Sequence, residues 1–111
     1  MICDQWDVVT VPFPFSESSG VKRRPAVVLS ARAFNGAGHV VLAMVTTQEH
    51  RAWPGDTPLS DREHAGLPRP CMVRLKLFTV DSRLILRRLG SLGPKDVGAV
   101  KETLRSFLPW D

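Results

Sequence analysis

The chain has 111 residues, of which 43% are hydrophobic and 23% are charged, a composition typical of one small globular domain. This length excludes a multidomain enzyme and a deep cavity around a large cofactor. No segment approaches the roughly 20 apolar residues of a membrane span, and the N-terminus lacks the pattern of a secretory signal. We therefore expect one soluble, cytoplasmic domain over residues 1–111.

The charge balance favours an anionic partner. Fifteen Lys and Arg stand against eleven Asp and Glu, which gives a net charge of +4, although solubility alone explains such a balance. Eleven of the fifteen basic residues are arginine, which binds phosphates through two hydrogen bonds and stacks on bases. Nucleic acid is therefore favoured over a membrane. The two cysteines, Cys3 and Cys71, lie far apart in sequence, and we expect reduced thiols.

The first half of the chain predicts three strands. Apolar residues alternate over residues 7–13, and Pro12 favours an edge strand or an early end. Residues 14–24 contain several serines and end in three cations, which indicates an exposed loop. Continuous apolar runs over residues 25–30 and 39–46 predict two core strands that are covered on both faces and joined by a short turn.

The second half is less regular. Six prolines and glycines interrupt residues 47–70, so we expect a loop with one short strand near residues 57–59. Strict alternation over residues 71–77 places the odd-numbered residues in the core and Met72, Arg74 and Lys76 on an outer face. Residues 83–89 are another candidate strand. Apolar residues at helical spacing after Pro94 predict a C-terminal helix of about four turns.

Short strands without βαβ alternation, followed by one terminal helix, predict a mainly β (α+β) fold. The arrangement is a small antiparallel barrel or a strongly curved sheet that the helix closes on one side.

Most familiar catalytic motifs are missing from the sequence. The three histidines and two cysteines never show the spacing of a zinc site, so no metal site is expected. No G-x-S-x-G sequence and no glycine-rich phosphate loop is present. Cys71, on an apolar strand face, is interpreted as a core thiol.

Two groups of polar residues flank the core strands and offer a different chemistry. They are Lys22, Arg23 and Arg24 before the first strand, and Thr46, Thr47 and Gln48 after the second. If these strands pair in antiparallel fashion, both groups share one rim, where an arginine beside a hydroxyl suits a phosphodiester. A solvated basic loop end, with threonines that cap a strand, explains the same residues without any such function.

An ordered set of short motifs over nearly the whole chain resembles the MazF/PemK family of toxins from type II toxin–antitoxin modules. The motifs are D-V-V (7–9), V-P-F-P-F (11–15), R-P-A-V-V-L-S (24–30), V-T-T-Q (45–48), A-G-L-P (65–68) and L-G-S-L (89–92). The resemblance implies an SH3-like barrel of the CcdB/MazF type that forms a homodimer. It also implies a metal-independent, sequence-selective endoribonuclease, or mRNA interferase, that requires no cofactor. Such an enzyme cleaves single-stranded RNA by attack of the 2′-hydroxyl, which inhibits translation and growth, and a cognate antitoxin restrains it.

The resemblance also suggests roles for individual residues. By position, Arg24 matches the family's catalytic arginine and Thr46 its catalytic threonine. Because the pKa of arginine exceeds about 12, we expect Arg24 to act electrostatically rather than as a base. The remaining expected substrate contacts are Phe15, Glu17, Lys22, Arg23, Thr47, Gln48, Arg74 and Lys76. Phe13 is expected in the core. The chain departs from the family at Trp6, where a glycine is usual, and at Cys71, where a serine is common.

Two other functions remain open. The first is a non-catalytic binder, like the CcdB toxins that poison DNA gyrase, although such a protein has no use for a phosphate-binding rim. The second is an RNA-binding regulator without activity, in which Arg24 and Thr46 persist as RNA contacts.

Overall fold

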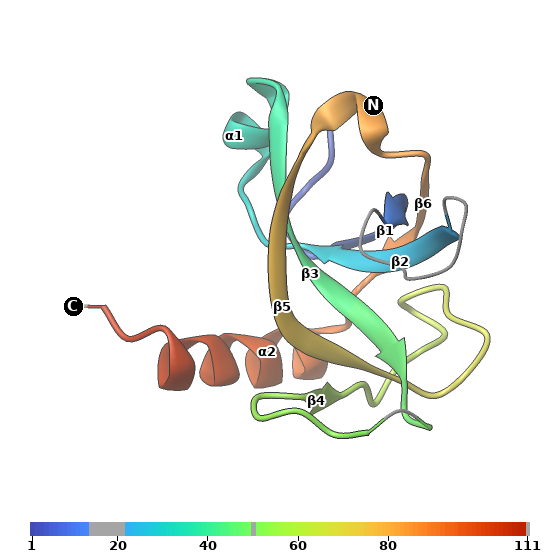
Figure 1. Cartoon of the computed structure of the whole chain (residues 1–111), viewed down its shortest axis with the longest axis vertical. Helices are drawn as coiled ribbons and strands as arrows, with labels where there is room; N and C mark the ends of the chain where they lie inside the picture. Colours follow the sequence, from blue (N-terminus) through green and yellow to red (C-terminus); the bar gives the residue numbers. More distant parts are fainter. Residues whose placement is uncertain (14–21, 50, 111) are drawn as a thin grey trace.

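The computed structural model describes residues 1–13, 22–49 and 51–110, which form a curled antiparallel sheet with a helix at its C-terminal end (Figure 1). The elements are β1 (Asp7–Phe13), β2 (Lys22–Val28), α1 (Arg32–Gly36), β3 (His39–Thr47), β4 (Thr57–Pro58), β5 (Cys71–Asp81), β6 (Arg87–Ser91) and α2 (Pro94–Phe107). The strand order is β4-β5-β3-β2-β1-β6, and every neighbouring pair is antiparallel. This arrangement confirms the predicted curved, mainly β fold with its C-terminal helix.

The sheet buries apolar residues on both faces. One face, here called the helix face, packs with Val100 of α2 and includes Val8, Val27 and Ala43. The other, here called the opposite face, carries a second cluster. Its members include Val9, Val11, Ala26, Val28 and Leu42. Burial on both faces is the reason that β2 and β3 contain continuous apolar runs, as the sequence predicted. Each fully buried valine contributes about 1.5–3 kcal/mol.

Strand β2 begins earlier than expected. Lys22, Arg23 and Arg24 were placed in a loop, but they pair with residues 11–13 of β1. The prediction was wrong because the ladder to β1 satisfies the backbone hydrogen bonds whatever side chains the strand end carries. The rest of that predicted loop, residues 14–21, lies outside the described part of the chain.

The expectation of an edge position for β1 was also wrong. Strand β1 lies between β2 and β6, although it contains Pro12. The ladder between β1 and β6 covers only Asp7–Thr10. It ends before Pro12, so the missing N–H of that residue is not required on this side.

The alternation of β5 holds only in part. Cys71 and Val73 are buried on the helix face, and burial raises the pKa of the Cys71 thiol, as expected of a core cysteine. Met72 is also buried, and Leu77 is 39% exposed although we expected it in the core. In the ladder, Met44 pairs with Arg74 and the preceding residue of β3, Ala43, pairs with Leu77. The irregularity inserts two residues into β5 and keeps Leu77 on the helix face, where it lines an open pocket beside Leu104 of α2 and stays partly exposed.

The remaining elements agree with the predictions from the sequence to different degrees. The short strand β4 and helix α2, which starts at Pro94, were predicted. The five-residue helix α1 was not, because it is too short to show helical periodicity. Strand β6 begins at Arg87 rather than at residue 83, since Ser82–Leu84 forms a 3₁₀ turn. No helix in the described part of the chain is long and apolar enough to cross a membrane.

Gly66 and Gly90 allow the segment before β5 to lie against β6. Gly66 has a φ of +72°, and a Cβ atom there would collide with the Leu89 carbonyl oxygen.

We predict that Gly66→Ala lowers the free energy of unfolding by at least about 2 kcal/mol through strain and backbone displacement. The matched change Gly98→Ala meets open space within α2 and should stabilise the protein by about 0.5–1 kcal/mol. Urea unfolding measures both, and an unchanged Gly66→Ala variant would contradict this packing.

Candidate functional site

Pairing of β2 with β3 places Arg24 and Thr46 at the same end of two neighbouring strands. The ladder between these strands ends at the pair Ala26 and Met44. Arg24 and Thr46 each lie two residues beyond this pair, and alternation assigns both side chains to the opposite face. A contact between the guanidinium and the hydroxyl at this rim stays a prediction.

The polar residues of this site, which we call the Arg24–Thr46 site, differ in their exposure. Thr46 is 5% exposed, Arg24 is half-buried and Lys22 is exposed. Lys22 pairs with Phe13, whose ring is buried against Phe78 in an edge-to-face contact with centroids 5.0 Å apart. Phe13 therefore belongs to the core, as expected. The site consists of a hydroxyl near the protein interior and cations toward solvent.

The cations of β2 take part in none of the ion pairs found in the described part of the chain. In residues 1–13, 22–49 and 51–110, the ion pairs are Arg32–Asp4, Arg74–Asp56, Arg83–Asp81 and Arg88–Asp7. None of these pairs involves Lys22, Arg23 or Arg24. Three consecutive cations at the start of β2 attract anions.

Strand alternation separates two of the predicted residues from the site. Arg23 pairs with Pro12, and Thr47 pairs with Cys71, so both lie on the helix face. The structure does not bring Arg23 and Thr47 together with Arg24 and Thr46. The expectation that three consecutive residues at each strand end share one site was wrong, because adjacent residues of one strand point to opposite faces.

Gln48 lies directly after β3 and is attached to the start of β5. Its backbone N–H donates to the Pro70 carbonyl at 3.2 Å, and its side-chain Nε2 donates to the Cys71 carbonyl at 3.3 Å. These bonds hold an exposed amide two residues from Thr46. Phe15 and Glu17, the other predicted contacts near this site, lie outside the described residues.

Arg74 is not the outward-facing cation that we expected. It is 7% exposed, and its Nε and Nη2 donate to the two carboxylate oxygens of Asp56 at 3.1 and 3.0 Å. Nη2 also donates to the Arg51 carbonyl at 2.6 Å. Arg74 therefore fastens the segment between β3 and β4 to β5. The prediction of exposure was wrong because alternation does not reveal that a loop folds back over this strand.

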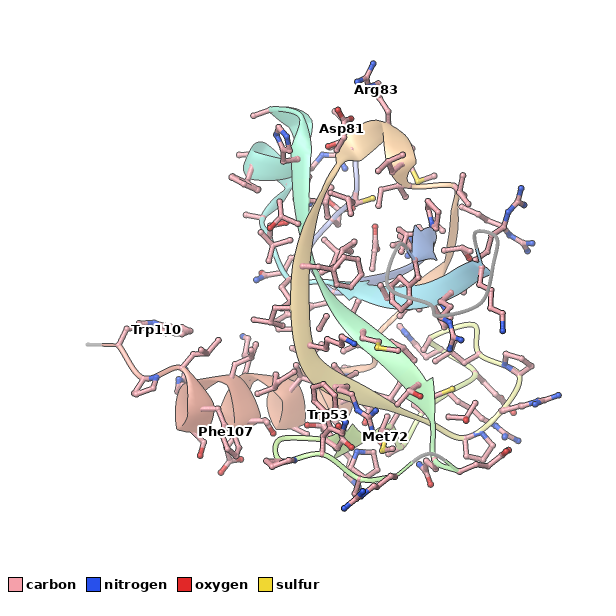
Figure 2. All side chains as sticks on the ribbon, viewed as in Figure 1. Trp53, Met72, Asp81, Arg83, Phe107 and Trp110 are labelled. Carbon is pink, nitrogen blue, oxygen red and sulfur yellow. The ribbon has the colours of Figure 1, made fainter. Side chains whose placement is uncertain are left out.

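The carboxylate of Asp56 stays ionised because of this clamp. Burial by itself raises the pKa of Asp56, but hydrogen bonds from Arg74 and from the Trp53 backbone N–H outweigh burial and lower it. Lys76 belongs to the same cluster, with its Nζ 5.6 Å from the centre of the Trp53 ring. Figure 2 shows Trp53 and Met72 beside the end of the sheet where β4 lies.

The chemistry of the Arg24–Thr46 site follows from its side chains. A guanidinium offers a permanent charge and a planar fork of N–H donors, and a threonine hydroxyl donates or accepts a hydrogen bond. Within the described part of the chain, no three His, Cys, Asp or Glu side chains cluster closely enough to hold a metal ion. A guanidinium and a hydroxyl are groups that can bind an oxyanion and stabilise added negative charge.

Residues 4–108 match the family model of PemK-like, MazF-like toxins of type II toxin–antitoxin systems. The chain belongs to this family. Comparison with curated protein sequences gives no significant match.

Solved structures of family members share the fold along the whole chain. MazF (Form-I) from Deinococcus radiodurans is 25% identical, with a TM-score of 0.76 and coverage of 99% of both chains. A MazE-MazF structure (Form-III) from the same organism is 23% identical, with a TM-score of 0.78 over 100% of both chains. An endoribonuclease from Mycobacterial species, in complex with its cognate antitoxin, is 20% identical. Its TM-score is 0.74, and the alignment covers 98% of this chain and 99% of that one.

The backbone explains one departure of this MazF/PemK-family chain from the family pattern. Trp6, which replaces the usual glycine, has a φ of +74°, in the left-handed region that glycine adopts without strain. Its N–H donates to the Val28 carbonyl at 2.7 Å, and its carbonyl accepts from Leu92 at 2.9 Å. These bonds fix the conformation. The tryptophan side chain packs against the helix-face cluster, which offsets the strain.

The Arg74–Asp56 clamp predicts a pH-dependent effect on stability. Asp56→Asn leaves a buried guanidinium without its counter-ion, so the free energy of unfolding at pH 7 should fall by about 3 kcal/mol. Because the folded pKa of Asp56 is lowered, its contribution is complete above the unfolded pKa of about 3.9 and is lost as the pH falls through the folded value. The difference from the wild type should therefore shrink below about pH 4.

Urea unfolding at several pH values measures this difference. The double variant Arg74→Met/Asp56→Asn should recover part of the lost stability, since it removes the buried charge as well. Asp81→Asn, which breaks a pair with the exposed Arg83, serves as a surface control. An Asp56→Asn variant as stable as the wild type at pH 7 would refute the clamp.

Proposed function

We propose that this toxin is a metal-independent, sequence-selective endoribonuclease that cleaves single-stranded RNA and thereby inhibits translation and growth. The observation that supports the proposal is the antiparallel pairing of β2 with β3, whose ladder ends two residues short of both Arg24 and Thr46 and so leaves them on one face at one rim. These residues stand at the positions that the family resemblance assigns to catalysis. Lys22 and Gln48 flank them and supply further contacts to the RNA.

The site suits attack by a neighbouring hydroxyl of the RNA itself. The 2′-hydroxyl gives up its proton to water as its oxygen forms a bond to phosphorus, the bond to the 5′-oxygen breaks, and the leaving 5′-oxygen takes up a proton from water. The products are a 2′,3′-cyclic phosphate, which water can open to a 3′-phosphate, and a 5′-hydroxyl. Arg24 remains protonated and stabilises the extra charge of the five-coordinate transition state. Thr46 orients the 2′-hydroxyl or a phosphate oxygen.

The proposed partners follow from family membership. A cognate antitoxin would bind this toxin, as a cognate antitoxin binds the mycobacterial endoribonuclease. We also propose that the toxin is a homodimer and acts in the cytoplasm, where RNA is available. A disordered antitoxin segment that folds across the Arg24–Thr46 site would compete with RNA for the same cations.

Substitutions at the two central residues test the chemistry. Incubation with a long, weakly structured RNA in EDTA should give discrete cuts with 5′-hydroxyl ends. Arg24→Ala and Thr46→Val should each reduce the cleavage rate by about 100-fold or more, since each removes one preorganised donor to the transition state. Thr46→Ser retains the hydroxyl and should keep more activity than Thr46→Val.

Arg83→Ala is the matched control for the removal of an arginine, because Arg83 is an exposed residue that follows the far end of β5. Its cleavage rate should equal that of the wild type. If the wild type gives no cuts, or if Arg24→Ala and Thr46→Val cut as fast as the wild type, the proposal is wrong. RNA binding without cleavage would then favour an RNA-binding regulator, and absence of both would favour a non-catalytic binder of another target.

The dependence of RNA binding on salt tests the cation contacts separately. If Lys22 and Arg24 each contact one phosphate, the logarithm of the binding constant should fall with the logarithm of salt concentration with a slope near −1.4, at about 0.7 per phosphate for a single strand. Lys22→Gln should reduce this slope by about 0.7. Titration of a labelled oligonucleotide at several salt concentrations measures the slope. An affinity that salt leaves unchanged would contradict these contacts.

A further inference from the structure

A partly exposed tryptophan lies over two cations next to the Arg24–Thr46 site. Trp53 follows β3 in sequence and is 42% exposed. The guanidinium carbon of Arg74 lies 4.8 Å from the centre of its ring, and Nζ of Lys76 lies 5.6 Å from it. Both cations project from β5, so they approach the ring from the sheet. The remaining surface of the indole faces solvent.

The backbone of Trp53 is held by Asp56. The Trp53 backbone N–H donates to Oδ2 of Asp56 at 2.7 Å, and the Trp53 carbonyl accepts from the Asp56 N–H at 3.1 Å. Asp56 is itself held by two hydrogen bonds from Arg74. The backbone that carries the indole is therefore ordered before any ligand arrives, which lowers the entropy cost of binding.

The ring also lies on the same side of the sheet as the Arg24–Thr46 site. Met72 of β5 pairs with Thr46, and Arg74 of β5 pairs with Met44. All four residues belong to the opposite face, and two residues along a strand span about 7 Å. An RNA strand whose phosphate lies at Arg24 and Thr46 can therefore reach Trp53 with a neighbouring nucleotide.

We propose that Trp53 is a base-stacking subsite for a nucleotide next to the scissile phosphate. The assignment rests on the proposed function and extends its site across β5. An exposed indole stacks on the face of any base, and single-stranded RNA is commonly held in this way. The cations on the sheet side of the ring hold it through cation–π contacts. The clamp between Arg74 and Asp56 then serves the substrate indirectly, because it holds Trp53 in place.

The test measures binding of a 20-nucleotide, unstructured 2′-O-methyl RNA that contains all four bases, which the proposed chemistry cannot cleave. Trp53→Leu should weaken binding by about 5- to 30-fold, the loss expected for one base–aromatic stack. Trp53→Phe preserves a flat aromatic ring and should lose much less. Trp110→Leu is the matched control, since Trp110 is 70% exposed at the C-terminal end beyond α2 (Figure 2). It should bind the RNA like the wild type.

Urea unfolding and size-exclusion chromatography establish that each variant is folded. The subsite is refuted if Trp53→Leu binds as tightly as the wild type, if Trp53→Phe loses as much affinity as Trp53→Leu, or if Trp110→Leu is equally impaired. Failure of the wild type to bind the RNA also refutes it. A wild type that binds through Trp53 but leaves unmodified RNA uncut would overturn the proposed ribonuclease and uphold the subsite.

Discussion

The antiparallel pairing of β2 with β3 is the constraint on which the site depends. It joins the start of one strand to the end of the other, so Arg24 and Thr46 lie at the same rim although they are distant in sequence. Because adjacent residues of a strand point to opposite faces, Arg24 and Thr46 lie on one face of the sheet. Arg23 and Thr47 lie on the other. The ladder is stabilised by apolar residues at its centre, such as Val27 and Ala43, which are fully buried. The stability of the fold therefore does not depend on the polar residues at the end of this ladder.

A second constraint is the ion pair between Arg74 and Asp56, which organises the segment that follows β3. Its two charges are nearly removed from water, and the hydrogen bonds from Arg74 and from the Trp53 backbone satisfy them. A buried pair of this kind contributes less to net stability than its Coulomb energy suggests, since desolvation opposes it. Its larger effect is on geometry. It holds the backbone of Trp53, and the guanidinium of Arg74 lies 4.8 Å from the centre of the indole ring.

The sequence predicted those features that local patterns encode. Continuous apolar runs identified β2 and β3, and Pro94 with helical spacing identified α2. The site pair Arg24 and Thr46 could be anticipated because it needs only two strands and their direction. The burial of Arg74 could not, because it depends on Asp56, which lies 18 residues away on a loop without periodicity. The left-handed backbone of Trp6 carried a signal only through the glycine that the family usually has there.

Arg24 and Arg74 show why a count of cations does not describe an RNA-binding surface. Both are strand residues assigned to the opposite face of the sheet, and each has an apolar neighbour in sequence. Arg74 has a carboxylate partner and is 7% exposed, so its charge is neutralised inside the protein. Arg24 is half-buried and belongs to none of the ion pairs of the described residues. Charges attract more strongly where they are partly removed from water, so the half-buried Arg24 interacts with an anion more strongly than a fully exposed cation would. The net charge of the chain is thus less informative than the burial and pairing of each arginine.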